Sequence, residues 1–245
     1  MISPTRGSRV SLQEHYDRKY AEIGQPHVVE LRDRPRDRHE MLAAVASERP
    51  GERYLEIGAG AGGVLLAVTP FFRELVATEL SPVRAAALTR TCATRPQIRV
   101  LCHDIDSQPL PFEPRSFDTI ALSGVIEHLI DPIRVLASLC ELLRPSGRVL
   151  IETPNIAKWT RRVKLALGYF PSTASRAEGL VAWDGVTPTE LYDEGHFHYF
   201  TFRSLRRVCL ERAGFSDVEA RGYGTHPLAR RWPELFSDVF VVATR

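Results

Sequence analysis

Three acidic side chains each follow an apolar run of the sequence, at points where a carboxylate could bind a ligand. Glu56 stands two residues before Gly58 in YLEIGAGAGG, Glu79 ends the run ELVATE, and Asp104 follows IRVLC. The glycines from Gly58 to Gly63 have the spacing G-x-G-x-x-G, which lets the backbone turn tightly and lets a ligand approach it closely. Such a loop is typical of sites for an adenosine-bearing cofactor, and the spacing alone does not say which one.

The positions of the acids favour one class of cofactor over another. Glu56 would repel the pyrophosphate of a nicotinamide dinucleotide, but it suits a cationic amino or sulfonium group. Glu79 lies about 20 residues after Gly58, where a carboxylate accepts hydrogen bonds from ribose hydroxyls in either kind of site. Asp104 could accept a bond from an adenine amino group. Each acid alone could be a helix cap or a loop acid, whereas the three in register favour a ligand.

Histidines supply candidates for a general base, because their ordinary pKa lies close to neutral pH. His128 lies in GVIEHL, and His196 and His198 lie in EGHFHYF. His128 could instead bond a loop backbone and shape the pocket, and the other two could simply pack and cap. Asn155 and Tyr199 are further candidates, for hydrogen bonds to a substrate.

The order of apolar runs and helical patterns predicts the elements that position these side chains. Strands are expected at 53–57, 74–79, 98–102, 117–123 and 147–152, and helices at 37–47, 64–70, 82–94 and 132–143. Continuous apolar strands that alternate with single helices predict a doubly wound α/β fold, with a parallel sheet and helices on both faces. Ligands of such sheets bind at the carboxyl ends of the strands, where the acids and His128 are expected.

The alternation stops after the fifth strand. Residues 153–200 form an insertion rich in aromatic side chains, after which Thr201 resembles the N-cap of a helix that Gly214 ends. The last two strand-like runs, 216–222 and 238–244, have no clear helical pattern between them. They therefore predict an antiparallel strand pair at the edge of the sheet.

Additions to this core would select the substrate. A predicted helix at 11–22 carries Tyr16 and Tyr20 one turn apart. Together with the insertion it would cover the cofactor crevice, form the acceptor pocket and exclude water. The aromatic side chains suit a sugar, a polyketide, a phenol or a lipid-like acceptor, although each could instead cover the core or a dimer interface. We expect a tail and lid helix at 1–35 and one main domain at 36–245.

The ordered series of motifs resembles one enzyme family. YLEIGAGAGG, VATELSP, HDIDSQPLPFEPRSFDTIALSGVIEHLIDP and LLRPSGRVLIETPN are similar, in this order, to the motifs of the class I S-adenosylmethionine-dependent methyltransferases. The resemblance covers residues 36–245, and GHFHYFTFRSLRRVCLERAGF is similar to the last helix and strand of small-molecule members. It implies a seven-stranded Rossmann-like sheet with an antiparallel last strand pair, and S-adenosyl-L-methionine as the cofactor.

The resemblance also implies a role for individual residues. The methionine part of the cofactor would be held by Glu56 and by the loop residues Gly58, Ala59, Gly60 and Gly62. Glu79 would bind the ribose, and adenine would be bound by Leu80, Asp104 and Ile105. Ser123 would face the methionine part and the substrate entrance. Some relatives that make ubiquinone or methylate RNA ends look like E-x-x-E-H at residues 124–128 and bind a divalent ion. This chain has Gly124 in place of the first acid and no nearby Cys/His cluster, so no metal is expected.

Composition limits the other function classes. The chain has 245 residues, a formal net charge of +2 and 4 cysteines. The cysteines lie far apart, so neither a disulfide framework nor a structural zinc site is indicated. The near-neutral charge implies no nucleic-acid partner, and no apolar run approaches the length of a signal peptide core or a membrane span. We expect a cytoplasmic protein with a small-molecule acceptor. The oligomeric state is left open, with a homodimer as one alternative.

The sequence thus predicts a methyltransferase of biosynthesis that acts on a small or medium-sized acceptor, by O-methylation of a sugar or secondary metabolite. One alternative is an NAD-dependent oxidoreductase, against which Glu56, Asp104 and the paired last strands argue. Another is a non-catalytic S-adenosylmethionine-binding regulatory module, which no sequence feature excludes. RNA or protein methylation has little support from a near-neutral chain without an added binding domain.

Overall fold

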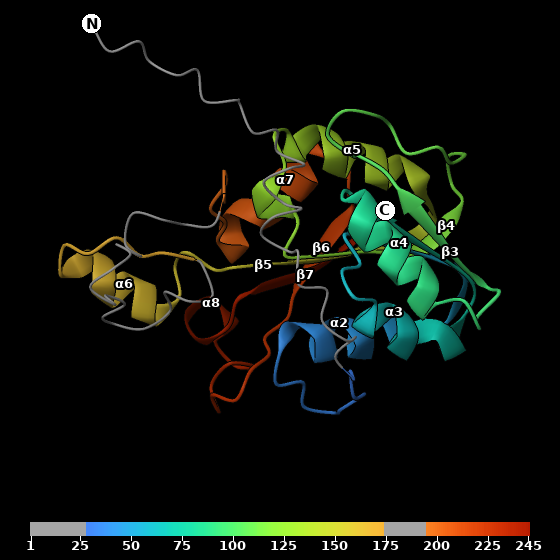
Figure 1. Ribbon diagram of the computed structural model, residues 1–245. Helices are drawn as coiled ribbons and strands as arrows, with labels where there is room; N and C mark the ends of the chain where they lie inside the picture. Colours follow the sequence, from blue (N-terminus) through green and yellow to red (C-terminus); the bar gives the residue numbers. More distant parts are fainter. Residues whose placement is uncertain (1–27, 174–194) are drawn as a thin grey trace, which may run out of the picture.

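A seven-stranded sheet in the order β3-β2-β1-β4-β5-β7-β6 forms the centre of the computed structural model, which describes residues 28–173 and 195–245 (Figure 1). β1 to β5 pair in parallel, and β7 is antiparallel to both of its neighbours, β5 and β6. The predicted parallel sheet with an antiparallel last pair is thus confirmed. The strands are β1 Gly51–Ile57, β2 Phe72–Glu79, β3 Ile98–Cys102, β4 Phe117–Ser123, β5 Leu143–Thr153, β6 Asp217–Ala220 and β7 Val239–Thr244.

Four of the helices in the described residues begin where a polar side chain caps the first turn, and the cap at Thr201 is the one that the sequence predicts. Asp37 caps α2, Ser81 caps α4 and Asp131 caps α5, while Thr201 and Ser204 form a capping box on α7. The helices are α2 Arg38–Ser47, α3 Gly63–Val68, α4 Pro82–Thr91, α5 Pro132–Leu142, α6 Trp159–Ala166, α7 Phe202–Arg212 and α8 Pro233–Phe236, with 3-10 turns η1 Thr69–Phe71 and η2 Ile126–His128.

The helices cover both faces of the sheet, so that two apolar cores lie on either side of it. One core packs α5 and α7 against the sheet, through side chains such as Leu136 and Leu205. The other packs α2, α3 and α4, through Leu42, Leu65 and Leu88. In Figure 1, α5 and α7 lie above the strands, and α2 and α3 lie below them. This three-layer arrangement leaves the carboxyl ends of the parallel strands open for a ligand.

The insertion after β5 leaves this layered arrangement. α6 projects to one side of the sheet, seen in yellow at the left of Figure 1. Its buried Arg161 donates from Nη1 to Asp238 Oδ1 at 2.9 Å and to the carbonyl of Asn155 at 2.8 Å. Burial acts to raise the pKa of Asp238, but the charges of Lys158 and Arg161 outweigh it, so that this pKa is lowered. A largely buried ion pair therefore ties the start of the insertion to Asp238, the residue directly before β7. The lid helix with Tyr16 and Tyr20 lies outside the described residues.

Candidate active site

A cavity of about 400 Å³ opens at the carboxyl ends of β1 to β4. The neighbouring pairs β2–β1 and β1–β4 are in parallel register, which brings the residues after each strand to the same edge. Of the residues predicted to bind the cofactor or act in catalysis, those that line the cavity are Glu56, Gly58, Ala59, Gly60, Leu80, Asp104, Ile105, Ser123 and His128. Residues from four strand ends thus meet in one space, as the sequence predicts.

The glycine loop is held against β2 by its own backbone. The N–H groups of Gly58 and Ala59 both donate to the carbonyl of Thr78, at 2.9 and 3.2 Å. Gly62 does not line the cavity. It is the N-cap of α3 with φ 85°, and a Cβ atom there would lie 2.5 Å from Leu88 Cδ1. The structure therefore places Gly62 where the loop packs on α4, and gives it a part in shaping the loop.

Glu56 is a buried acid in the floor of the cavity. Tyr54 donates its hydroxyl to Glu56 Oε2 at 3.2 Å, and only 5% of the residue is exposed. Burial raises the pKa of Glu56 to about 8, because an ionised carboxylate is poorly solvated there. The hydrogen bond from Tyr54 lowers this pKa, and the charge of Glu79 raises it. An approaching cation would favour the ionised form, so the site is suited to a positively charged ligand.

Glu79 lies beneath the glycine loop and does not line the cavity. Its Oε1 accepts a hydrogen bond from the backbone N–H of Gly60, and its Oε2 lies 3.7 Å from Arg84 Nε. Burial raises its pKa, while Arg84 and the Gly60 bond act in the opposite direction. The carboxylate therefore fixes the loop in the structure, and a role in binding ribose stays a prediction.

Asp104 organises the loop after β3. Its Oδ1 accepts from the N–H of Asp106 at 3.0 Å, and its Oδ2 accepts from Ser107 Oγ at 2.6 Å. Asp106 in turn accepts from the N–H of Ile130 at 3.1 Å, which joins this loop to the segment before α5. Asp104 and Ile105 are thereby held at the cavity wall, close to the end of β3.

Two further acids lie buried beside the cavity, Glu127 in the 3-10 turn η2 after β4 and Glu152 near the end of β5. Glu152 accepts from Ser123 Oγ and from the Tyr223 hydroxyl, both at 2.8 Å. Glu127 accepts from Thr153 Oγ1 at 3.0 Å. Burial and the charge of Glu152 raise the pKa of Glu127 to about 8, and burial raises the pKa of Glu152. Ser123 thus lines the cavity while its hydroxyl points to this buried pair.

His128 is the one of the three predicted histidines that lines the cavity. Its Nδ1 lies 3.2 Å from the carbonyl oxygen of Gly195. Since a carbonyl only accepts, this contact requires a proton on Nδ1, and the neutral ring then carries its acceptor lone pair on Nε2. The ring of His196 meets His128 edge-on at 4.7 Å, and its Nδ1 lies 2.6 Å from Thr173 Oγ1. His196 is therefore placed to support His128.

The two histidines and one acid form a group that could hold a metal ion. One potential ligand atom from each of Glu127, His128 and His196 lies within 4.8 Å of the others. The sequence concealed this group, because His196 is distant along the chain and approaches only in the fold. A Cβ atom at Gly124, where some relatives have another acid, would lie 3.0 Å from Arg38 Nη1. A guanidinium therefore lies beside Glu127, and its positive charge opposes a second cation there.

The structure gives Asn155 a different role from the predicted substrate contact. It is fully buried, and Nδ2 donates to the carbonyls of Glu234 and Ser237 at 3.0 Å. Its Oδ1 accepts from the N–H of Ala157 at 2.9 Å. Because both ends of the amide bind backbone groups, Asn155 holds the insertion and the α8 segment together. Asn155 does not line the cavity, and its predicted contact with a substrate stays a prediction.

Two other predicted residues also lie away from the cavity lining. Tyr199 is 41% exposed, and its ring meets Phe170 at 6.4 Å. His198 Nε2 is buried and makes no hydrogen bond within 28–173 and 195–245. The predicted contact of Tyr199 with the substrate and the predicted catalytic role of His198 therefore stay predictions.

Sequence reasoning missed several side chains that line the cavity, among them Arg38 and His39. They lie in the first turn of α2, which the pattern predicts, but the pattern does not say that this turn faces the strand ends. Arg84 of α4 and His103, which directly follows β3, also line the cavity and were not predicted. The available signal was the run DRHE, in which a helix cap precedes two cationic or titratable side chains.

Comparison with known proteins assigns the family. The model of a family described as "Methyltransferase domain" matches residues 27–220. The chain belongs to the methyltransferase domain family. It is 24% identical over 200 residues to a ubiquinone biosynthesis O-methyltransferase of Cereibacter sphaeroides, covering 78% of this chain and 71% of the relative. It is 29% identical over 174 residues to a demethylmenaquinone methyltransferase of Clavibacter sepedonicus, covering 70% and 68%.

Solved structures agree on the fold. A putative methyltransferase from Bacillus halodurans superposes with a TM-score of 0.59 at 14% identity, over 84% of this chain and 97% of that one. This methyltransferase domain is therefore a class I, S-adenosylmethionine-dependent one, and its cofactor is S-adenosylmethionine. None of the helices in the described part of this methyltransferase is long and apolar enough to cross a membrane.

Proposed function

We propose that this methyltransferase moves the methyl group of S-adenosylmethionine to an oxygen of a small or medium-sized hydroxylated acceptor, such as a sugar, a phenol or another secondary metabolite. The observation that carries the proposal is the placement of His128. Its Nδ1 bond to Gly195 directs the other ring nitrogen to act as the proton acceptor, and the residue lines the cavity. The name of the Cereibacter sphaeroides relative, an O-methyltransferase, supports an oxygen nucleophile.

The chemistry asks little of the protein beyond alignment and proton removal. The sulfonium carries an activated methyl group, so an acceptor oxygen has to be held in line with the S–CH3 bond in a site that excludes water. As the oxygen attacks the methyl carbon, the S–C bond breaks and the hydroxyl proton passes to His128 Nε2. The products are the methyl ether, S-adenosylhomocysteine and a protonated imidazole, which then releases its proton to water.

The test is turnover by His128→Ala with a panel of acceptors that includes a catechol, a reduced quinone and a hexose. General base catalysis contributes about 100- to 10,000-fold, so kcat should fall by that factor while the affinity for S-adenosylhomocysteine changes little. His226→Ala is the matched control, because His226 is exposed and stacks on Phe236 at 4.2 Å. Equal turnover by His128→Ala and the wild type would exclude His128 as the base. Binding of S-adenosylhomocysteine by the wild type without turnover of any acceptor would favour a non-catalytic module.

A further inference from the structure

Asp106 joins two walls of the cavity. One is the adenine wall, residues 103–107 after β3, and the other is the His128 segment, residues 126–131. Asp106 lines the cavity, and 12% of its side chain is exposed. Both of its carboxylate oxygens lie 3.1 Å from the backbone N of Ile130, and Oδ1 lies 3.4 Å from the backbone N of the next residue. One carboxylate thus accepts from two consecutive N–H groups of the other wall.

The N–H groups that Asp106 holds lie close to His128 along the chain. Ile130 is two residues after His128, and Leu129 between them is 4% exposed, packs in an apolar core and also lines the cavity. The N–H groups of His128 and Leu129 each donate to the carbonyl three residues earlier. A connection of two residues, fixed at both ends, therefore leaves the backbone of His128 little freedom relative to Asp106.

The backbone of Asp106 is joined to the acid that is predicted to bind adenine. Its N–H donates to Asp104 Oδ1 at 3.0 Å, and Asp104 also accepts from the N–H and the hydroxyl of Ser107, at 3.3 and 2.6 Å. Arg134, in the first turn of α5, donates from Nη2 to the carbonyl of Asp106 at 2.6 Å and to that of Ile105 at 3.3 Å. A carboxylate and a guanidinium therefore both fix the adenine wall to the chain that follows His128.

Stability alone does not explain a carboxylate at this place. Ile130 is 68% exposed and Asp131 is exposed, so water can replace Asp106 at both N–H groups when the acid is removed. Hydrogen bonds that water can replace contribute little to the free energy of folding. The bonds instead select one position of the segment, because a carboxylate accepts stronger hydrogen bonds than water does.

We propose that Asp106 is a positioning residue that couples the adenine wall to His128, so that a bound adenine ring sets the position of the imidazole. Asp106 forms no bond to the reacting atoms and acts through the N–H of Ile130. The catalytic part of this inference rests on the proposed function, in which His128 is the base. The coupling of the two walls does not depend on that role.

Nuclear magnetic resonance of the imidazole nitrogens tests the coupling without turnover. The signals of His128 are assigned by comparison with His128→Ala. Saturating adenosine, which carries the base and the ribose alone, should shift these signals in the wild type. In Asp106→Ala, adenosine should still bind in an isothermal titration, but most of the shift should be lost. Asp106→Asn should keep the shift, because its amide oxygen still accepts from an N–H group.

A double-mutant cycle tests the catalytic part. In Asp106→Ala, kcat should fall roughly 10- to 100-fold, the size expected when a reacting group is displaced by about 1 Å. In the His128→Ala background the same substitution should lower kcat much less, since the base that Asp106 positions is already absent. Asp106→Asn should restore most of kcat. An equal factor in both backgrounds would overturn the catalytic part, because a merely structural acid would act in the same way in each.

Asp217→Ala is the matched control, because Asp217 is an exposed aspartate at the start of β6, at the opposite edge of the sheet from β3. Circular dichroism melts of each variant show that it is folded. If His128→Ala turns over at the wild-type rate, the proposed function fails, and the adenosine-induced shift still decides the coupling. A shift of equal size in the wild type and in Asp106→Ala, or no shift in the wild type, would overturn it.

Discussion

The cofactor side and the acceptor side of the cavity are built in different ways. On the cofactor side, Glu56, Glu79 and Asp104 end or follow β1, β2 and β3, whose parallel register fixes their spacing. On the acceptor side, His128 comes from a 3-10 turn and is held by the carbonyl of Gly195, which lies 67 residues further along the chain, within the insertion. A site that sheet register determines can be predicted from local motifs, whereas one made by distant segments cannot.

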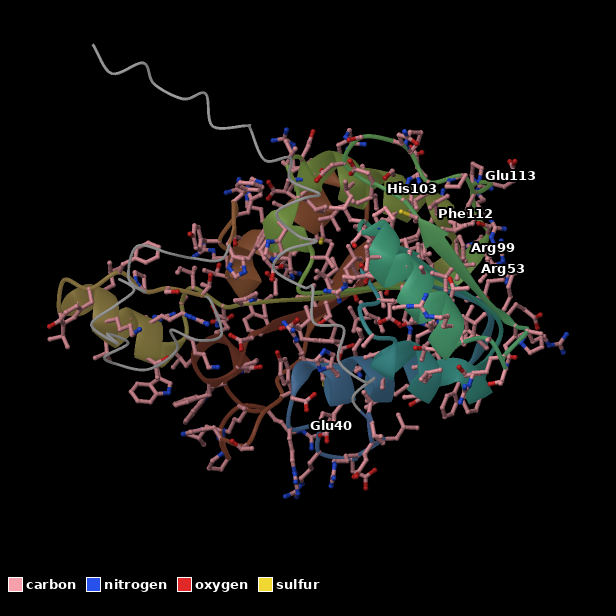
Figure 2. The ribbon with its side chains drawn as sticks, viewed as in Figure 1. Glu40, Arg53, Arg99, His103, Phe112 and Glu113 are labelled. Atoms are coloured by element: carbon pink, nitrogen blue, oxygen red, sulfur yellow. The ribbon has the colours of Figure 1, made fainter. Side chains whose placement is uncertain are left out.

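The largest effect that tests this difference is expected from Glu79→Ala. If the carboxylate binds both ribose hydroxyls, its loss should lower the affinity for S-adenosylhomocysteine roughly 100-fold or more, since hydrogen bonds to a charged group are strong. Isothermal titration calorimetry measures the affinity for S-adenosylhomocysteine in both proteins. Glu113→Ala is the control, because Glu113 is an exposed acid on the loop between β3 and β4 (Figure 2). Unchanged affinity in Glu79→Ala would limit the residue to its hydrogen bond with Gly60.

On the acceptor side, Asn155→Ala should act on stability. It leaves the carbonyls of Glu234 and Ser237 and the N–H of Ala157 without the amide of the buried Asn155, which should lower the free energy of unfolding by about 2–3 kcal/mol. Urea denaturation measures the change. The KM of an accepted substrate should stay near the wild-type value in the variant that remains folded. A raised KM with unchanged stability would instead support the predicted contact between Asn155 and the substrate.

The pH dependence of cofactor binding tests Glu56. Its pKa of about 8 means that the acid is largely protonated at pH 6, whereas the ammonium of the cofactor binds the ionised form. Affinity for S-adenosylhomocysteine should therefore rise as the pH rises towards 8, by up to about tenfold per pH unit, and binding below pH 8 should release a proton. Titrations in buffers of different ionisation heat detect that proton.

Glu56→Gln serves as the control for the pH experiment. It should remove the contribution of Glu56 and leave that of Glu79, whose pKa burial also raises. A slope that is the same in the wild type and in Glu56→Gln would show that another group binds the ammonium.

The smallest effect is expected from removal of divalent ions. Because the Arg38 guanidinium lies beside Gly124 and Glu127, we expect EDTA to leave turnover and cofactor affinity unchanged. Loss of turnover that Mg²⁺ or Mn²⁺ restores would instead identify Glu127, His128 and His196 as a metal site.

Much of the sheet and the cofactor loop could be predicted, because apolar runs and caps are local signals. The predicted end of the fourth strand at Ser123 is the observed one. The edges of other elements differ: β5 starts at Leu143, earlier than the glycine at 147 suggests, since its first residues pair at the register shift opposite Phe117. Such pairing depends on the neighbouring strand and is invisible in a single run of residues.

Side-chain direction could not be predicted in the same way. Ser123 ends β4 and Asn155 lies two residues after the end of β5. Yet the amide of Asn155 binds backbone groups of the α8 segment, whereas Ser123 lines the cavity. Arg38 and His39 lie in a predicted helix, but only the packing of α2 against the sheet shows that they reach the cavity. His196 lies near the end of the insertion and meets the ring of His128 in the fold, which no spacing in the sequence reveals.

The central claim is that the open edge from β1 to β4 holds S-adenosylmethionine. Calorimetric titration of the wild-type protein with S-adenosylhomocysteine, and separately with NADH, tests it most directly. We expect saturable binding of S-adenosylhomocysteine at one site per chain, weakened by Glu79→Ala, and no binding of NADH. Binding of NADH without binding of S-adenosylhomocysteine would contradict it.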